Sequence, residues 1–286
     1  MKCWMLYDSC DLMVNRDFVT LMKKHANAIG LNIEAVEKEK INIFLDEHGK
    51  PCCLQDGKIN KPDIVLSRQR DFRFSEHFEL MGVKVYNNSR VCRICNDKWQ
   101  THQFLHNLPM LKTYLITNVQ LSPPLPYPFI AKPVGGHGGK GVCLIENKEQ
   151  WCEYKHTGEI IIQEVAKYAG VDVRVYVLDG DILTAVKRTA NHGIISNFKL
   201  GGSVSLYSLS KEERQLVELV IQRFELAGAP LKFAGVDLLY HSNGAVIGEI
   251  EDVVGSRMLY QVSDIDIAKM LLDNITSYGK ACESDT

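Results

Sequence analysis

The residues best suited to chemistry lie in a glycine-rich stretch between residues 129 and 142. A short apolar segment ends at Lys132, five glycines follow with Lys140 among them, and a second apolar segment starts at Val142. Because glycine has no Cβ atom, this backbone can approach an anion closely and direct several N–H groups at it, while the lysines add positive charge. The stretch predicts a phosphate-chain site on a strand–loop–strand unit. A mobile hairpin tip is the alternative, since the spacing matches neither the P-loop nor the dinucleotide-binding pattern.

Carboxylates inside two apolar segments near the C-terminus form a second candidate set. Alternate residues of a strand share a face, so Glu249 and Glu251 point the same way, and Asp237 joins them if the two strands are neighbours. Such carboxylates repel one another unless a cation neutralises them, and hard oxygen ligands suit Mg²⁺ or Mn²⁺. The spacing favours a metal site over the alternatives, which are solvated strand faces or acids paired with Arg174, Arg188 and Arg257.

Three arginines follow the apolar segment at residues 64–66, namely Arg68, Arg70 and Arg73. Ligands of open α/β sheets bind at the carboxyl ends of the strands, so these side chains are candidates for holding a substrate carboxylate. Solvated surface charge is the competing interpretation.

Cysteines and histidines give weaker indications. The nine cysteines are an odd number in a chain without a secretory signal, which predicts reduced and mostly buried thiols. Cys92 and Cys95 have no second pair at zinc-site spacing. His102 and His106 lie four residues apart, but the residue after His102 is not the glutamate of a metalloprotease helix, so we expect ordinary surface or core histidines.

Composition predicts an ordinary globular protein. The chain has 286 residues, of which 45% are hydrophobic and 24% charged, and its net charge is −2. We therefore expect no general attraction to nucleic acid or to anionic membranes, and any polyanion site must be local. Without a signal peptide or a long apolar run, we expect a cytoplasmic protein.

The elements that must position these residues begin with an α/β unit over residues 1–95. Strand and helix patterns alternate there, and the helix that ends near Ile29 is closed by Gly30. The alternation predicts a largely parallel sheet. Its expected strands are 3–6, 31–36, 41–45, 64–66 and 83–86.

The remaining chain continues with helix and strand patterns. A helix pattern begins with Asn96 as its expected cap and carries Lys98 in its first turn, where a lysine opposes the helix dipole unless an anion lies nearby. Ser210 and Glu213 form a capping box before a long helix. The expected strands are 129–132, 142–145, 160–165, 171–178, 182–187, 234–239 and 245–251.

Taken in order, these motifs resemble the ATP-grasp carboxylate-amine ligases, and most closely their RimK-like branch, which adds amino acids such as glutamate to a carboxyl group. The similarity covers residues 88–276 and is carried by Asn-Asp-Lys98, Ala-Lys132-Pro with its glycine-rich loop, Gln163-Glu164-Val165, Asp172-Val-Arg174, Lys-Arg188, Ser-Asn197, Gly-Val-Asp237 and Glu249-Ile-Glu251. The resemblance implies an α+β ATP-grasp fold, in which an N-terminal α/β domain over residues 1–95 precedes two subdomains, over residues 96–165 and 166–280, that clamp the nucleotide.

The resemblance also implies roles for individual residues. Lys98, Lys132 and Lys140 would hold the phosphates under a lid that includes Gly138 and Gly139. Gln163, Glu164 and Val165 would bind adenine, and Asp172 the ribose. Arg174 and Arg188 would face the transferred phosphate and the acyl phosphate. Asp237, Glu249 and Glu251 would bind two Mg²⁺ ions, with Asn197 beside them.

Three departures set this chain apart from the branch. Glu251 stands where the branch has asparagine, Ile195 and Leu200 replace arginines that often flank the Ser-Asn segment, and Arg257 follows the metal strand where substrate would approach. We therefore expect an acceptor pocket of its own, with Arg257 and the Arg68, Arg70 and Arg73 group as candidates for binding anionic substrate groups.

The function that the resemblance implies is ATP- and Mg²⁺-dependent formation of an amide bond, through an acyl phosphate, between a small-molecule or peptide carboxylate and an amino acid. No nucleic acid or membrane partner is expected, and a homo-oligomer is left open. The rival is a catalytically silent ATP-binding module with a regulatory or scaffold role. The full set of acids and lysines argues against that rival, because binding alone would not need it.

Overall fold

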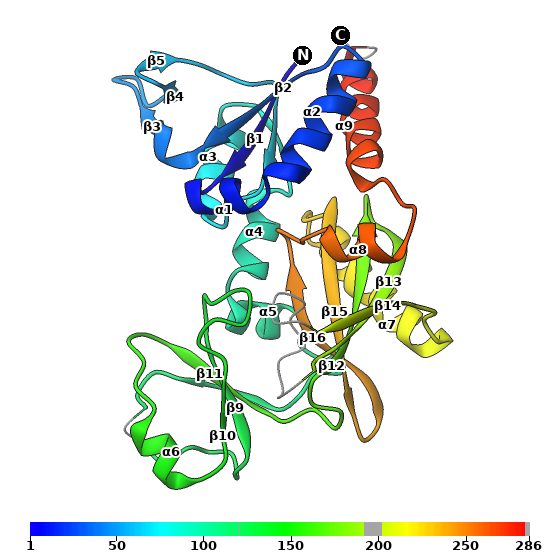
Figure 1. Cartoon of the computed structure of the whole chain (residues 1–286). Coiled ribbons are helices and arrows are strands. Elements are labelled where there is room, and N and C mark those ends of the chain that lie inside the picture. Colours follow the sequence, from blue (N-terminus) through cyan, green and yellow to red (C-terminus); the bar gives the residue numbers. More distant parts are fainter. Residues whose placement is uncertain (120, 192–201, 284–286) are drawn as a thin grey trace.

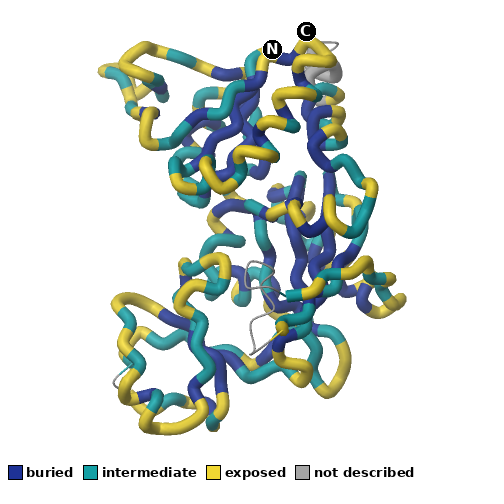
Figure 2. The backbone as a smooth tube through the Cα atoms, in the orientation of Figure 1, coloured by how far each residue is buried: buried dark blue, intermediate teal, exposed yellow. Residues whose placement is uncertain are grey.

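The structure is a computed structural model that describes residues 1–119, 121–191 and 202–283. Three sheets follow one another along the molecule, and a small fourth sheet projects from one end (Figure 1). The buried parts of the chain coincide with these sheets and their covering helices, while the connecting loops are largely exposed (Figure 2). The mixture of helices and sheets agrees with the predicted class. None of the helices in these ranges is both long and apolar enough to cross a membrane.

The first sheet has four parallel strands in the order β2-β1-β6-β7. Five successive residues of β1 are buried, as expected for a parallel strand covered on both faces. Met5 packs with Met22 of α2, while Trp4 packs with Phe78 of α3 on the other face. The predicted parallel sheet is confirmed. Its elements are β1 (Lys2–Tyr7), α1 (Ser9–Val14), α2 (Arg16–Ala28), β2 (Asn32–Glu37), β6 (Ile64–Ser67), α3 (Phe72–Leu80) and β7 (Lys84–Tyr86).

The strand expected at 41–45 exists but does not join the parallel sheet. It is β3 (Ile41–Leu45), which forms a separate antiparallel sheet with β4 (Pro51–Gln55) and β5 (Lys58–Ile59), reached through the short 3-10 helix Lys38–Lys40. The short turns between these three strands explain why they pair with one another. Asp46 accepts backbone hydrogen bonds across the first turn, and Asp56 and Gly57 take φ angles of 50° and 77° in the second. Connections this short permit only antiparallel neighbours.

The second sheet is antiparallel, in the order β10-β9-β11-β8, and contains the predicted strand–loop–strand unit. Trp151 of α6 packs edge-on against Phe129 of β9, at a ring-centroid distance of 5.5 Å, and helps to close a small core. The strand β8 was not predicted. The elements are β8 (Thr113–Ile116), β9 (Phe129–Pro133), β10 (Cys143–Ile145), α6 (Lys148–Glu153) and β11 (Ile160–Glu164).

The third sheet has five antiparallel strands in the order β14-β13-β12-β15-β16. The predicted hairpin at Asp179 and Gly180 is present, with φ angles of 52° and 83°, and the capping box of Ser210 and Glu213 starts α7. The elements are β12 (Val171–Leu178), β13 (Asp181–Thr189), β14 (Ser203–Tyr207), α7 (Lys211–Leu226), β15 (Phe233–His241) and β16 (Gly244–Glu251).

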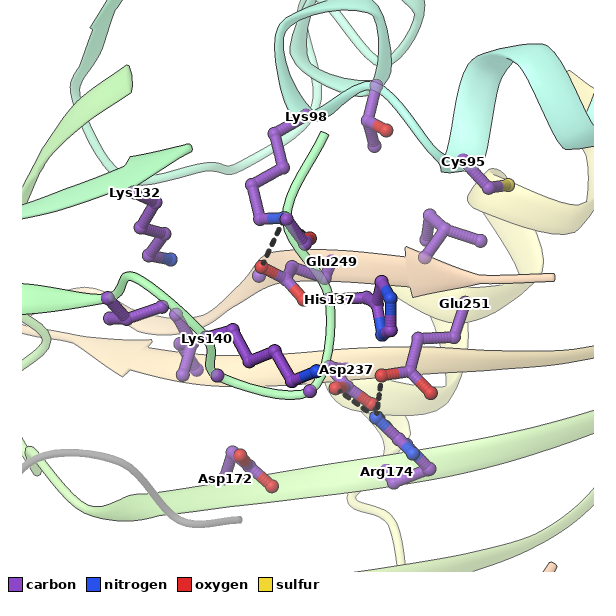
Figure 3. Close-up of a pocket in the computed structure, with 18 of the residues that line it drawn as sticks. Cys95, Lys98, Lys132, His137, Lys140, Asp172, Arg174, Asp237, Glu249 and Glu251 are labelled. Atoms are coloured by element: carbon purple, nitrogen blue, oxygen red, sulfur yellow. Dashed lines mark hydrogen bonds and ion pairs between the residues drawn. The ribbon is translucent and has the colours of Figure 1, made fainter. Parts of the chain in front are cut away.

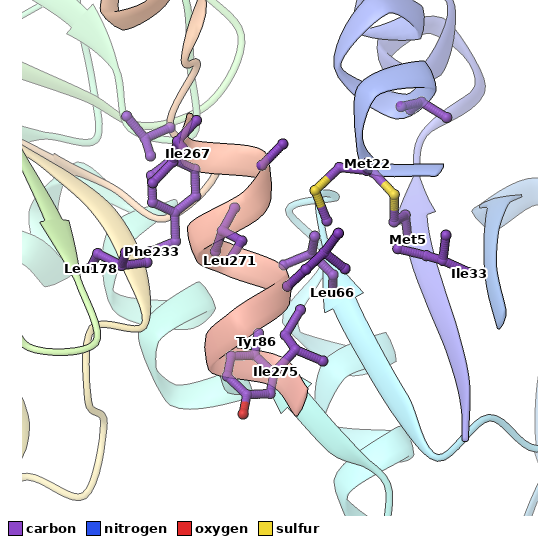
Figure 4. Close-up of a cluster of buried hydrophobic side chains, with 14 of the residues drawn as sticks. Met5, Met22, Ile33, Leu66, Tyr86, Leu178, Phe233, Ile267, Leu271 and Ile275 are labelled. Atoms are coloured by element: carbon purple, nitrogen blue, oxygen red, sulfur yellow. The ribbon is translucent and has the colours of Figure 1, made fainter. Parts of the chain in front are cut away.

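The C-terminal helix α9 (Ile267–Glu283) connects the first and third sheets through one apolar core. Leu271 lies between Leu66 of the first sheet and Phe233 of the third (Figure 4). Since α9 also packs along α2, the two sheets are held by a shared core rather than by a hinge alone. The helices α4 (Ser89–Cys95), α5 (Lys98–Phe104) and α8 (Arg257–Val262) complete the structure between the sheets.

Candidate functional site

One cavity of about 320 Å³ brings most of the predicted site residues together. It lies where the second and third sheets meet, and it extends to the chain that follows β6 of the first sheet. The predicted residues that line it are Arg68, Arg70, Lys98, Lys132, Gly138, Gly139, Lys140, Gln163, Glu164, Val165, Asp172, Arg174, Arg188, Asp237, Glu249, Glu251 and Arg257.

Lys98 reaches the cavity from the first residue of α5. The cap of this helix is Asp97, whose side chain accepts a 2.8 Å hydrogen bond from the Gln100 backbone, so the expected cap at Asn96 was wrong by one residue. The ammonium group of Lys98 donates to the Gly136 carbonyl and lies 3.8 Å from Glu249 (Figure 3). Lys98 thus links the start of a helix, the glycine-rich loop and an acidic strand.

Lys132 lies half-buried near the end of β9 and donates a 2.9 Å hydrogen bond to Gln163 on the neighbouring strand β11. Burial lowers the pKa of Lys132, and the nearby charge of Lys98 acts in the same direction, although Glu249 opposes both. A buried cation with a lowered pKa is stabilised by an incoming anion. Lys132 is therefore placed to bind a negatively charged group entering the cavity.

The glycine-rich loop needs glycine for steric reasons at several positions. Gly138, Gly139 and Gly141 have φ angles of 64°, 77° and 72°, which residues other than glycine rarely adopt. A Cβ atom on Gly141 would also lie 2.7 Å from Cγ of Pro133. The loop lies across the cavity and carries His137 and Lys140 over it (Figure 3).

The acids and arginines of the third sheet converge because the strand register pairs them. Arg174 faces Asp237 across β12 and β15, Asp172 faces Arg188 across β12 and β13, and Asp237 faces Glu249 across β15 and β16. Residues two apart share a face, so all of these side chains emerge on one side of the sheet.

Asp237 is the centre of this network. It accepts two hydrogen bonds of 2.7 Å from Arg174 and one of 2.6 Å from Arg188, and all three side chains are buried. Burial by itself would raise the pKa of Asp237, but the two guanidinium charges outweigh it and lower the pKa to about 2. Arg174 also lies 2.9 Å from Glu251 (Figure 3).

The acids do not form a ready-made metal cage. In the ranges that the structure describes, no three His, Cys, Asp or Glu side chains are grouped closely enough to hold an ion. Asp237 is turned to the arginines, which is the pairing that the sequence had left as an alternative. Glu249 and Glu251 remain about a third exposed toward the cavity. Their carboxylates fit a hard divalent cation that is also bound by phosphates.

Comparison with known proteins decides the family. A model of the RimK-like ATP-grasp domain matches residues 95–275, which is more than half of the chain. The chain belongs to the RimK-like ATP-grasp family. Membership agrees with the predicted resemblance and makes the protein an ATP-dependent ligase that forms carbon–nitrogen bonds.

Two of the related proteins are named as a ligase and a synthase. The chain is 28% identical over 249 residues to a probable alpha-L-glutamate ligase of Haemophilus influenzae, covering 82% of this chain and 81% of that one. It is 29% identical over 235 residues to beta-citrylglutamate synthase B of Danio rerio, covering 77% of this chain and 57% of that one.

Solved structures show the same fold. The D-Ala:D-Ser ligase VanG of Enterococcus faecalis superposes with a TM-score of 0.72 at 18% identity, covering 97% of this chain and 99% of that one. A RimK domain ATP-grasp protein of Sphaerobacter thermophilus gives a TM-score of 0.70 at 17% identity, covering 96% and 98%.

The edge of the ATP-grasp cavity predicted to bind adenine is the end of β11. The Glu164 backbone donates a 3.0 Å hydrogen bond to the Lys112 carbonyl, and the Lys112 backbone donates to the Glu164 side chain at 3.3 Å. These bonds fix the point where the chain passes from the second sheet to the third. Gln163, Glu164 and Val165 all line the cavity there.

Two predicted residues are placed differently, and a third is not described. Arg73 does not line the cavity, because its guanidinium is mostly exposed on α3 and bonds to Asp71, the cap of that helix. Asp172 lines the cavity but is buried and paired with Arg188 rather than free for a ribose hydroxyl. Asn197 lies outside the described residues.

Several cavity residues were not predicted. His102 lies one turn after Lys98 on α5, and burial together with the charge of Lys132 lowers its pKa to about 4. Its Nε2 lies 3.3 Å from the amide nitrogen of Gln163, which also donates to Thr113 at 2.9 Å. A neutral His102 is therefore an acceptor that orients the Gln163 amide, whose oxygen faces Lys132. The four-residue spacing from Lys98 could have revealed it.

A second unpredicted group surrounds Asp252. Burial raises the pKa of this carboxyl to about 6, against the effect of a 3.0 Å hydrogen bond from Asn96. Cys92 and Cys95 lie beside it as free thiols, and burial raises the pKa of both. Neither environment favours a thiolate. The expectation of mostly buried cysteines was wrong for the described residues, in which Cys3, Cys53 and Cys92 are buried and the other five cysteines are partly or fully exposed.

Proposed function

We propose that this protein uses ATP to activate a carboxylate as an acyl phosphate and joins it to the amino group of an amino acid. The observation that carries the proposal is the single cavity in which Lys98, Lys132 and Lys140 face the acid and arginine network of the third sheet. Phosphoryl transfer requires mainly positioning and charge neutralisation, and this arrangement supplies cations on both sides of the reacting groups.

The chain's own groups divide this work. Lys98, Lys132 and Lys140 would bind the phosphates, with the glycine-rich loop covering them and excluding water that would hydrolyse an acyl phosphate. The chain around Glu164 and Val165 would hold the adenine. Because the Gln163 amide oxygen faces Lys132, the hydrogen bonds of Gln163 to His102 and Thr113 would keep that lysine oriented.

The guanidinium groups of Arg174 and Arg188 would stabilise charge on the transferred phosphoryl group, and Asp237 holds both in place. Glu249 and Glu251 would hold Mg²⁺ or Mn²⁺, which would neutralise phosphate charge when bound. The joined product would form when the amine attacks the acyl carbon and phosphate leaves, so that no side chain of the protein needs to become covalently modified.

These proposed residue roles also support three structural units, over residues 1–95, 96–165 and 166–280. The first would bind the acceptor at the carboxyl ends of its strands, the second would carry the phosphate lysines, and the third would carry the acids. Helix α9 packs with the core of the first sheet, so the first and third units would act as one body.

The test is ADP release from Mg²⁺-ATP with pools of carboxylic acids and amino acids. We expect release that requires one member of each pool, disappears in Lys132→Ala, and persists in Lys148→Ala, a control lysine that starts α6 and does not line the cavity. ADP binding without release under any pool would instead support a silent ATP-binding module. No binding of ADP or ATP would contradict the proposal altogether.

A further inference from the structure

Arg68 is a buried arginine that forms no ion pair within 4.0 Å in the part of the chain that the structure describes. It follows β6, lines the cavity and is only 4% exposed. One of its terminal nitrogens donates a 2.7 Å hydrogen bond to the Val254 carbonyl, while its Nε atom is buried with no hydrogen-bond partner in the described residues. No carboxylate among those residues lies within 4.0 Å of its guanidinium.

This arrangement is costly in an empty cavity. A guanidinium keeps its proton at physiological pH, so burial cannot neutralise it as it would a lysine or a carboxyl group. The rings of Phe18 and Phe233 lie 5.8 Å and 5.7 Å from it and supply only weak cation–π attraction. A buried charge is retained at such a cost when something of opposite charge completes the site.

Neighbouring groups make this end of the cavity positive and leave room for an anion. Arg70 is neutralised by Asp11 at 2.6 Å, but Arg257 at the start of α8 has no carboxylate partner in the described ranges. The hydroxyl of Tyr7 lies close enough to Arg68 for the guanidinium to act against burial, which raises the pKa of Tyr7. Arg68 and Arg257 thus both line the cavity with no carboxylate within 4.0 Å in the described ranges, while the charges of Arg68 and Arg70 act to lower the pKa of Asp252, which burial raises.

We infer that Arg68, assisted by Arg257, binds a second carboxylate of the acceptor, so that the acceptor is a dicarboxylic acid. This inference rests on the proposed function, because it assigns the activated carboxylate to the acids and arginines of the third sheet and the unreacted carboxylate to Arg68. Arg68 is then a specificity-determining residue: it distinguishes acceptors with a second carboxylate from those without one.

The test is calorimetric binding of matched probes to the full chain. Succinate and glutarate are compared with butyrate, which has one carboxylate, and with 4-aminobutyrate, which has one carboxylate and an amine. The variants are Arg68→Met and the control Arg73→Met, whose arginine is exposed and outside the cavity. We expect one dicarboxylate to bind wild type and Arg73→Met alike and Arg68→Met at least tenfold more weakly, as for loss of a charge-assisted pair.

Other results would overturn the inference. These are equal dicarboxylate affinity in wild type and Arg68→Met, no dicarboxylate binding to wild type, or an Arg68-dependent affinity only for 4-aminobutyrate, which would assign Arg68 to the incoming amino acid. ADP affinity, measured in parallel, separates failure of this subsite from failure of the proposed function. If Arg68→Met does not fold, Arg68→Gln gives the same test, because glutamine removes the charge but keeps a polar side chain that can donate to the Val254 carbonyl.

Discussion

Replacing Asp237 by Asn should destabilise the protein by ~3 kcal/mol at pH 7, because it leaves two buried arginines facing a neutral amide. The wild-type carboxylate accepts three hydrogen bonds from Arg174 and Arg188, and their charges outweigh burial and lower its pKa to about 2. Relative to the usual value of 3.8, that pKa corresponds to ~2 kcal/mol of stability at neutral pH. The remainder of the expected loss is the cost of unpaired guanidinium donors.

The sign of the pH dependence follows from the lowered pKa. The contribution of Asp237 is complete above the unfolded-state pKa and is lost as the pH falls through the folded-state value. In urea unfolding, we therefore expect the stability gap between wild type and Asp237→Asn to be ~1 kcal/mol smaller at pH 3 than at pH 7. The control Asp17→Asn, at a fully exposed carboxylate, should change little at either pH. A gap that does not change with pH, or a more stable Asp237→Asn protein, would refute the reasoning.

Two further variants test the nucleotide side of the cavity. Gly141→Ala should raise the KM for ATP at least tenfold, because the added Cβ would lie 2.7 Å from Pro133 at a residue whose φ is 72°. The control Gly135→Ala has no atom within 4 Å of the added Cβ and no positive φ, so it should behave like wild type. Equal effects of the two variants in steady-state kinetics would contradict the steric argument. His102→Phe removes the hydrogen-bond acceptor that faces Gln163 and should raise the KM for ATP about fivefold, a change equivalent to ~1 kcal/mol. An unchanged KM would show that Gln163 orients Lys132 without the help of His102.

Much of the fold could be predicted from local patterns, for reasons visible in particular elements. The β1 strand is buried at five successive residues, and the capping box at Ser210 marks the start of α7. The strand β3 was assigned to the wrong sheet, because hydrophobicity predicts a strand but not its partner. The turn at Asp46 and Gly49 determined that pairing.

The arrangement of the site could be predicted where it depends on residue spacing along one strand. It could be predicted less well where it depends on how neighbouring strands pair. Glu249 and Glu251 share a face as expected. The bonds that turn Asp237 to two arginines depend on register between β12, β13 and β15, which one sequence does not reveal. The unpaired state of Arg68 likewise depends on how the chain after β16 passes the first sheet, and on where Val254 therefore lies.

The most direct test of the central claim follows the oxygen atoms of the acceptor. An acceptor that supports ADP release is labelled with ¹⁸O in both oxygens of the reacting carboxylate, and the phosphate released in one turnover is analysed by mass spectrometry. If the carboxylate is activated as an acyl phosphate, one ¹⁸O atom passes to each phosphate when the amine displaces it. Unlabelled phosphate accompanied by amide product would contradict the account.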